Sequence, residues 1–260
     1  MSARLRILPL VLLALTLAGC GAFGEKPDIT RDWPVQRLYG EAKAALDGGD
    51  YETAVDYYEK LESRFPFGRY AEQAQIDIAY AYWKQEENAS AIAAAERFIK
   101  LHPRHPNVDY AYYLKGLVNF EQGTTFLDRV VPKDRSQRDP GAVRQAFDDF
   151  SELVKRFPGS KYAEDSRQRM VYLKNLLAQH EVHVADYYMR RGAYVAAANR
   201  ARHVVENYQG APAVPEALVL MAKAYSFMDL DDLSADALRV LKLNFPEHPG
   251  IAEVASIKKD

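Results

Sequence analysis

Residues 64–72 read Arg-Phe-Pro-Phe-Gly-Arg-Tyr-Ala-Glu, and residues 156–164 read Arg-Phe-Pro-Gly-Ser-Lys-Tyr-Ala-Glu. Asn244-Phe245-Pro246 repeats the centre of this motif, and Leu101-His102-Pro103 and Asn207-Tyr208-Gln209 are weaker copies. The third residue of the five copies falls at positions 66, 103, 158, 209 and 246, with spacings of 37, 55, 51 and 37 residues. Self-similarity of this kind indicates a structural repeat of about 34 residues that carries inserts of various lengths.

Each copy closes a longer pattern of small and large residues. Twelve residues before the five positions stand small residues: Ala54, Ala91, Ala146, Ala197 and Ser234. Five residues before them stand large apolar ones: Leu61, Phe98, Leu153, Val204 and Leu241. In four of the units, small residues also stand twenty-four positions earlier: Ala42, Ala79, Ala185 and Ala222. Twenty-one positions earlier, the same four units have Ala45, Tyr82, Tyr188 and Tyr225. Small residues allow two antiparallel helices to approach closely, and a proline after the second helix ends it.

This pattern resembles the tetratricopeptide (TPR) repeat. The resemblance implies an all-α solenoid of five helix pairs over residues 36–260, in which each pair covers the apolar face of the next. The alternative is a generic helical bundle whose alanines fall in register by chance. Tyr58 and Tyr82 stand at consensus positions of this repeat, so we expect them in the core.

The third unit departs from the pattern because a polar insert at about 121–140 separates its two helices, near 110–120 and 143–157. Asp139-Pro140 is expected to provide the N-cap and the first residue of the second helix. An insert of this length is either a tolerated surface loop or a partner-binding excursion.

The first nineteen residues are typical of a secretory signal peptide, with Arg4 and Arg6 before the apolar run 7–17. Leu17-Ala18-Gly19-Cys20 resembles the bacterial lipobox, which implies diacylglycerol and an N-acyl chain on Cys20. The alternative is an ordinary signal peptide with a chance cysteine, but Cys20 is the only cysteine in the chain. Residues 20–35 then form a flexible tether, and no second apolar run approaches the ~20 residues of a membrane span.

Composition narrows the function classes further. Hydrophobic residues make up 48% and charged residues 27%, and the chain without residues 1–19 has 32 basic and 36 acidic side chains. A slightly acidic body is a poor partner for nucleic acid. No phosphate-binding loop or nucleophile motif is present. His180 and His183 could hold a metal, but no third ligand is obvious, so we expect no metal, no cofactor beyond the lipid and no catalysis. A metal-dependent hydrolase built on these two histidines is the enzymatic alternative.

The lipobox and the repeats together resemble the BamD family of outer-membrane lipoproteins over the whole mature chain. The stretches that carry the resemblance are 64–68 with Tyr70, 98–107, 134–140, 146–147, 150–151 and 191–196 with Asn199-Arg200. The Asp-Arg-Ser-Gln-Arg-Asp-Pro insert at 134–140 is the most specific of them, because ordinary TPR proteins lack it.

This resemblance implies a protein on the periplasmic face of the outer membrane. It would bind the POTRA domains of BamA and companion lipoproteins, and recruit unfolded β-barrel proteins to a groove rich in tyrosine. Carried over residue by residue, it makes Phe65, Phe67, Gly68 and Tyr70 client-side candidates and Arg200 a BamA-side candidate. The alternative is another TPR lipoprotein scaffold, such as a pilotin-like factor of secretin assembly or a cell-wall coordination protein.

Overall fold

The computed structural model describes residues 28–122 and 135–257, and the described chain is built from helices that pair in sequence order. Cys20 and most of the predicted insert lie outside these residues. The first helices of the five pairs are α2 (Val35–Gly48), α4 (Arg69–Lys84), α6 (Val108–Glu121), α9 (Ala163–Arg190) and α11 (Val214–Phe227). The second helices are α3 (Tyr51–Arg64), α5 (Asn88–Leu101), α8 (Gly141–Arg156), α10 (Tyr194–Asn207) and α12 (Asp231–Asn244).

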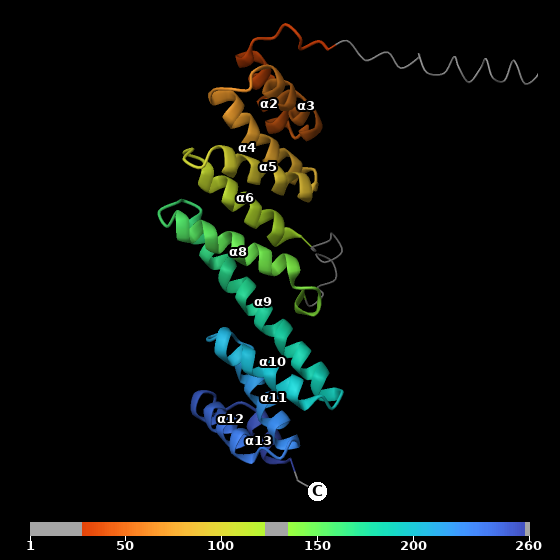
Figure 1. Ribbon diagram of the computed structural model, residues 1–260, viewed down its shortest axis with the longest axis vertical. Helices are drawn as coiled ribbons and strands as arrows, with labels where there is room; N and C mark the ends of the chain where they lie inside the picture. Colours follow the sequence, from red (N-terminus) through yellow and green to blue (C-terminus); the bar gives the residue numbers. More distant parts are fainter. Residues whose placement is uncertain (1–27, 123–134, 258–260) are drawn as a thin grey trace, which may run out of the picture.

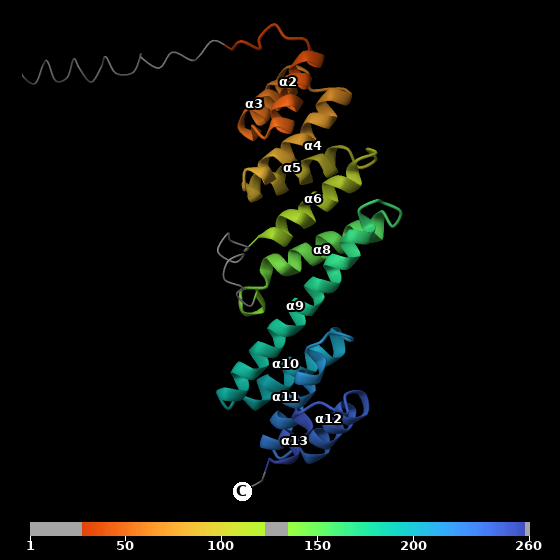
Figure 2. The same ribbon diagram turned by 180° about the vertical axis from the view of Figure 1, so that it is seen from behind.

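The pairs stack along one long axis, and the short helix α13 (Gly250–Ala255) covers the C-terminal end (Figures 1 and 2). Each second helix packs on the first helix of the following unit, so the core is a chain of linked clusters and not one central body. This arrangement confirms the predicted all-α TPR solenoid, whose units complete one another's apolar faces.

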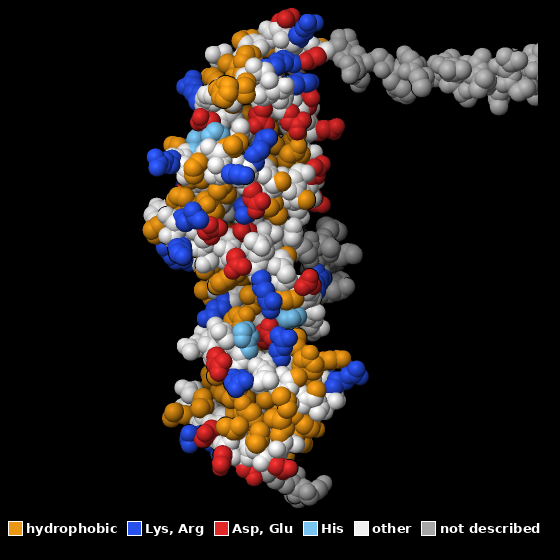
Figure 3. Space-filling model, viewed as in Figure 1, with side chains coloured by type: hydrophobic (Ala, Val, Ile, Leu, Met, Phe, Trp, Pro, Cys, Tyr) orange, Lys and Arg blue, Asp and Glu red, His pale blue; other side chains and the backbone are white. Residues whose placement is uncertain are grey.

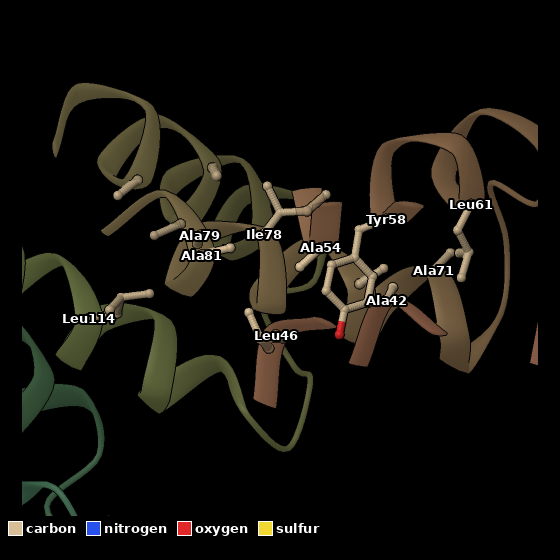
Figure 4. Close-up of a cluster of buried hydrophobic side chains, with 14 of the residues drawn as sticks. Ala42, Leu46, Ala54, Tyr58, Leu61, Ala71, Ile78, Ala79, Ala81 and Leu114 are labelled. Atoms are coloured by element: carbon tan, nitrogen blue, oxygen red, sulfur yellow. The ribbon is translucent and has the colours of Figure 1, made fainter. Parts of the chain in front are cut away.

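The residues of the repeat pattern form this core. The small residues Ala42, Ala54, Ala79 and Ala91 are wholly buried in a cluster of side chains from α2 to α6, which we call the N-terminal cluster. Figure 4 shows Ala42, Ala54 and Ala79 among the side chains of this cluster. The five large residues that precede the motif are also wholly buried: Leu61, Phe98, Leu153, Val204 and Leu241. Each of these side chains contributes about 1.5–3 kcal/mol by leaving water. Tyr58 is buried as predicted, whereas Tyr82 packs on the same cluster but keeps its hydroxyl near the surface, 2.9 Å from Glu59.

The repeated Phe-Pro motif ends the second helix of a unit in the same way each time. Phe65, Phe157 and Phe245 cap α3, α8 and α12 with φ between −138° and −130° and ψ between 62° and 66°. Each of their N–H groups still donates to the carbonyl of the buried residue four positions earlier, at 2.8 Å. The following proline excludes the helical conformation from the residue before it, so the helix stops at this position.

The turns inside the units follow the sequence with one correction. Gly49 and Gly192 have φ of 81° and 72°, a region that favours glycine, in the turns within the first and fourth helix pairs. The prediction for Asp139-Pro140 was one residue early: α8 begins at Gly141, and Pro140 is the N-cap. The Asp139 carboxylate nevertheless accepts a hydrogen bond from the Gly141 N–H at 3.1 Å. Residues 135–137 form a short 3-10 helix that packs on α9.

A close approach of α6 and α8 depends on Gly116. A Cβ atom at this position would lie 2.5 Å from Cε1 of Phe150, a wholly buried ring. Gly40 lies in α2 with open space around its Cα, so it offers a matched comparison.

Replacing Gly116 by alanine should lower the free energy of unfolding by about 1–3 kcal/mol, because the methyl group displaces Phe150 from a packed core. Gly40→Ala should raise it by about 0.5–1 kcal/mol, because alanine favours a helix where nothing obstructs it. Urea denaturation followed by circular dichroism measures both. Equal effects of the two substitutions would contradict the close packing of α6 on α8.

Candidate binding surfaces

The four client-side candidates lie together where α3 ends and α4 begins, with Tyr70 in the first turn of α4. Phe67 is 91% exposed, the most exposed large hydrophobic side chain among the described residues. Phe65 and Tyr70 are half-buried and pack against the N-terminal cluster. Gly68 has φ of 96°, so the turn needs glycine there. The turn therefore presents one free aromatic ring, Phe67, above two rings that are partly fixed by packing.

Tyr70 is one of five half-buried tyrosines that lie on the first helices or, for Tyr162, at the N-cap of one. We call them the aromatic band: Tyr39, Tyr70, Tyr110, Tyr113 and Tyr162. The Tyr39 and Tyr70 rings are 5.2 Å apart, and the Tyr113 and Tyr162 rings stack at 4.6 Å. Tyrosine offers a large rigid surface with one hydroxyl, which suits the recognition of extended segments.

Asp77 anchors the N-terminal part of the aromatic band. Its Oδ2 accepts hydrogen bonds from the hydroxyls of Tyr39 at 3.2 Å and Tyr58 at 3.0 Å, and its Oδ1 accepts one from Gln73 at 2.9 Å. Burial raises the pKa of the Asp77 carboxyl, although these three donors oppose the shift. Burial likewise raises the pKa of Tyr39, with the Asp77 charge as the second cause. The carboxylate thus fixes two tyrosines from two helices.

A second acid holds the band at the start of α9. Tyr113 donates to Asp165 at 2.7 Å, and Arg169 donates to the same carboxylate oxygen at 2.6 Å. Burial and the bond to Asp165 raise the pKa of Tyr113 to about 12. Partial burial raises the pKa of Asp165, but the bonds from Arg169 and Tyr113 outweigh it and leave the pKa below its ordinary value. Sequence reasoning missed both acids, although Asp77 stands between Ile76 and Ile78 in an otherwise apolar run.

The BamA-side candidate Arg200 lies on α10 with its side chain 47% exposed. Its Nη1 is 2.9 Å from Oε2 of Glu181 on α9, and Glu181 is only 2% exposed. Arg144 of α8 lies 3.1 Å from the other oxygen of the same carboxylate. A single buried acid therefore fixes two half-exposed guanidinium groups from two helices. No sequence pattern indicated this group, because Arg144 and Arg200 are 37 and 19 residues away from Glu181.

The histidine pair has a structural environment on α9. His180 Nδ1 is 2.7 Å from the carbonyl oxygen of Ser136, which is 2% exposed in the 3-10 helix of the insert. His180 and His183 also line a shallow cleft between that helix and the C-terminal part of α9. Within residues 28–122 and 135–257, no three side chains of the metal-ligating kinds come together. His180 thus contributes to holding the insert on the solenoid.

The C-terminal units expose an apolar edge at the turns between their paired helices. Its side chains, which we call the C-terminal strip, are each 43–65% exposed: Tyr187, Val195, Phe227, Leu230 and Leu233. Tyr194 stacks on Phe227 at 4.9 Å and joins the two turns. Figure 3 shows hydrophobic side chains gathered over the C-terminal helices. Exposed apolar surface of this extent marks interaction sites in proteins.

The N-terminal segment is fastened to the body next to the client-side turn. Arg64 donates to the carbonyl oxygen of Thr30 at 2.5 Å and also pairs with Asp28, and Thr30 is wholly buried. Hydrogen bonds from Thr30 lower the pKa of Asp28. Within the described chain, every helix is too short or too polar to cross a membrane.

Asp77→Asn should remove a pH dependence of stability. Because the pKa of Asp77 is higher in the folded than in the unfolded chain, the folded state binds this proton more tightly. The contribution of Asp77 to stability therefore falls as pH rises from its ordinary pKa of 3.8 through the raised value. In urea titrations, the free energy of unfolding of Asp77→Asn relative to the wild type should increase from pH 4 to pH 7. Asp165→Asn is the control: because the pKa of Asp165 is lowered in the folded chain, its contribution to stability is nearly complete above the ordinary pKa of 3.8, so its relative stability should change little over this range.

Comparison with known proteins places the chain in a family. The model of the YfiO family, described as an outer membrane lipoprotein, matches residues 31–241. The outer membrane protein assembly factor BamD of Neisseria gonorrhoeae is 49% identical over 94% of this chain and 92% of its own length. The protein of the same name from Vibrio cholerae is 40% identical over 90% of this chain and 96% of its own. A thermophilic TPR protein of Thermus thermophilus, 15% identical, covers 86% of this chain and 98% of its own, with a TM-score of 0.37. The chain belongs to the YfiO family of outer membrane lipoproteins.

Proposed function

We propose that this protein is a non-catalytic adaptor of the complex that assembles β-barrel proteins in the outer membrane. The observation that carries the proposal is the high identity, along nearly the whole chain, to assembly factors named BamD. In this role the protein binds the POTRA domains of BamA and companion lipoproteins, and it recruits unfolded barrel proteins. Lipid on Cys20 attaches it to the periplasmic face of the outer membrane.

The N-terminal units carry the surface for clients. The exposed Phe67 ring lies beside Phe65, Gly68 and Tyr70, and Tyr70 belongs to the aromatic band, where its ring is next to that of Tyr39. An extended client segment with an aromatic end would place its apolar side chains on these rings, while Asp77 holds Tyr39 and Tyr58 in place. Binding of this kind uses preformed aromatic surface and needs no covalent chemistry.

The C-terminal units carry the surface for BamA. Arg200 presents a fixed, half-exposed positive charge, and the C-terminal strip adds apolar area near the end of the same helix pair. An interface with an apolar centre and an arginine is the usual composition of a protein docking site. Client and BamA would thus occupy different ends of one solenoid, held near the membrane by the same anchor.

Co-purification tests the assembly role. The lipidated protein, isolated from outer membranes in mild detergent, should recover BamA in stoichiometric amounts by mass spectrometry. Recovery of a secretin or of cell-wall enzymes in place of BamA would support the alternative TPR scaffold and overturn the proposal.

Phe67→Ala should weaken binding of a peptide that ends in the C-terminal strand of a barrel protein by about tenfold, which corresponds to about 1.4 kcal/mol. The reason is the loss of one fully accessible aromatic contact. Leu243→Ala on α12 is the matched control, because Leu243 is 81% exposed but lies at the other end of the solenoid. Fluorescence anisotropy measures both affinities, and equal affinities for the two variants would remove Phe67 from the client surface.

Cys20→Ser should abolish incorporation of radiolabelled palmitate and release the chain from the membrane fraction. Three acyl chains bind a bilayer far more firmly than one, and the substitution removes the thiol to which the diacylglycerol is joined. Palmitate incorporation that persists in the variant would contradict lipidation at this residue.

A further inference from the structure

The long helix α9 joins two halves of the solenoid. The N-terminal half consists of α2 to α8 and the C-terminal half of α10 to α13. Helix α9 has 28 residues, twice as many as α10, and is about 42 Å long. Its first turns pack on α8, and its later turns pack on α10 and α11 (Figures 1 and 2). The described helices of the N-terminal half make no extensive contact with those of the C-terminal half. The angle between the halves therefore depends on what braces α9.

Glu181 occupies the point on α9 where the halves meet. Its Oε1 is 3.1 Å from Arg144 of α8, and its Oε2 is 2.9 Å from Arg200 of α10. Each oxygen of one carboxylate therefore holds a guanidinium from a different half. The Glu181 side chain is 2% exposed, so water does not compete freely for these bonds.

The ion pair of Asp186 on α9 differs in kind. Asp186 pairs with Arg190 four residues later on the same helix, and both side chains are at least 40% exposed. Such a pair lies within one helix, contributes little and cannot fix one helix against another. A buried carboxylate leaves a strongly unfavourable uncompensated charge if either partner moves away, so the Arg144–Glu181–Arg200 group resists changes of geometry.

We propose that Glu181 is a positioning residue that holds Arg200 in place and braces the two halves of the solenoid at one angle. In consequence the client surface of the N-terminal half and the BamA surface of the C-terminal half keep one relative direction. This consequence for binding rests on the proposed function, whereas the bracing itself does not.

The distance between the halves tests the bracing. Ala89→Cys on α5 and Ala235→Cys on α12 place spin labels at two exposed positions, one in each half, of the full mature protein in mild detergent. Double electron–electron resonance should give one narrow distance distribution for the parent protein. Glu181→Gln should broaden or shift it, and Arg144→Gln, which keeps Arg200 paired with Glu181, should do so to a lesser degree. Asp186→Asn, which removes an exposed acid from the same helix, should leave the distribution unchanged.

Binding to the purified periplasmic domains of BamA tests the consequence. Glu181→Gln should weaken this binding at least about tenfold although Arg200 is still present, and Glu181→Asp should restore part of the affinity. Circular dichroism confirms that the variants are folded, and Arg144→Gln serves in place of Glu181→Gln if the latter does not fold. Three results would overturn the proposal. Glu181→Gln could give a distance distribution as narrow as that of the parent, or Asp186→Asn could broaden the distribution as much as Glu181→Gln does. The third is an unchanged affinity of Glu181→Gln for the BamA domains.

The same samples separate this proposal from the proposed function. If the parent protein does not bind the BamA domains, the proposed partner is wrong, and the distance measurements still decide the role of Glu181. If mass spectrometry finds three spin labels per chain, Cys20 is not lipidated, and the distances are then measured with Cys20→Ser added.

Discussion

The structure depends on one repeated contact, in which small buried residues let the two helices of a unit approach and a large apolar residue joins that unit to the next. Ala42 and Ala54 in the first pair and Ala185 and Ala197 in the fourth are wholly buried. Because no central core exists, each unit is stable only through its neighbours. Gly116 shows how tight these contacts become, since even a methyl group there would overlap Phe150.

Acidic side chains at the contacts between helices add direction to this apolar packing. Asp77 fixes tyrosines from α2 and α3, Asp165 fixes Tyr113 of α6, and Glu181 fixes arginines from α8 and α10. Each of these carboxylates joins elements that a purely apolar contact would leave free to slide. A solenoid that must present surfaces at both ends benefits from such links, because small rotations between units add up along its length.

The two ends of the solenoid differ in chemistry. The N-terminal end presents Phe67 and the aromatic band next to the point where the N-terminal segment is held by Arg64. The C-terminal end presents Arg200 and the C-terminal strip. The adaptor role that we propose requires two distinct surfaces of this kind, and the proposed lipid on Cys20 would keep both close to the membrane.

The sequence by itself determined the helix pairs, because repeat spacing, small residues and prolines act through local geometry and periodic burial. It placed α8 one residue early at Asp139-Pro140, because capping residues can shift by one position without loss of their hydrogen bond. Only the tertiary structure decided that α9 continues through two units, that Tyr82 keeps its hydroxyl near the surface, and that Asp77 and Glu181 gather partners from other helices. Those features depend on side chains that are distant in the chain and meet only when the units stack.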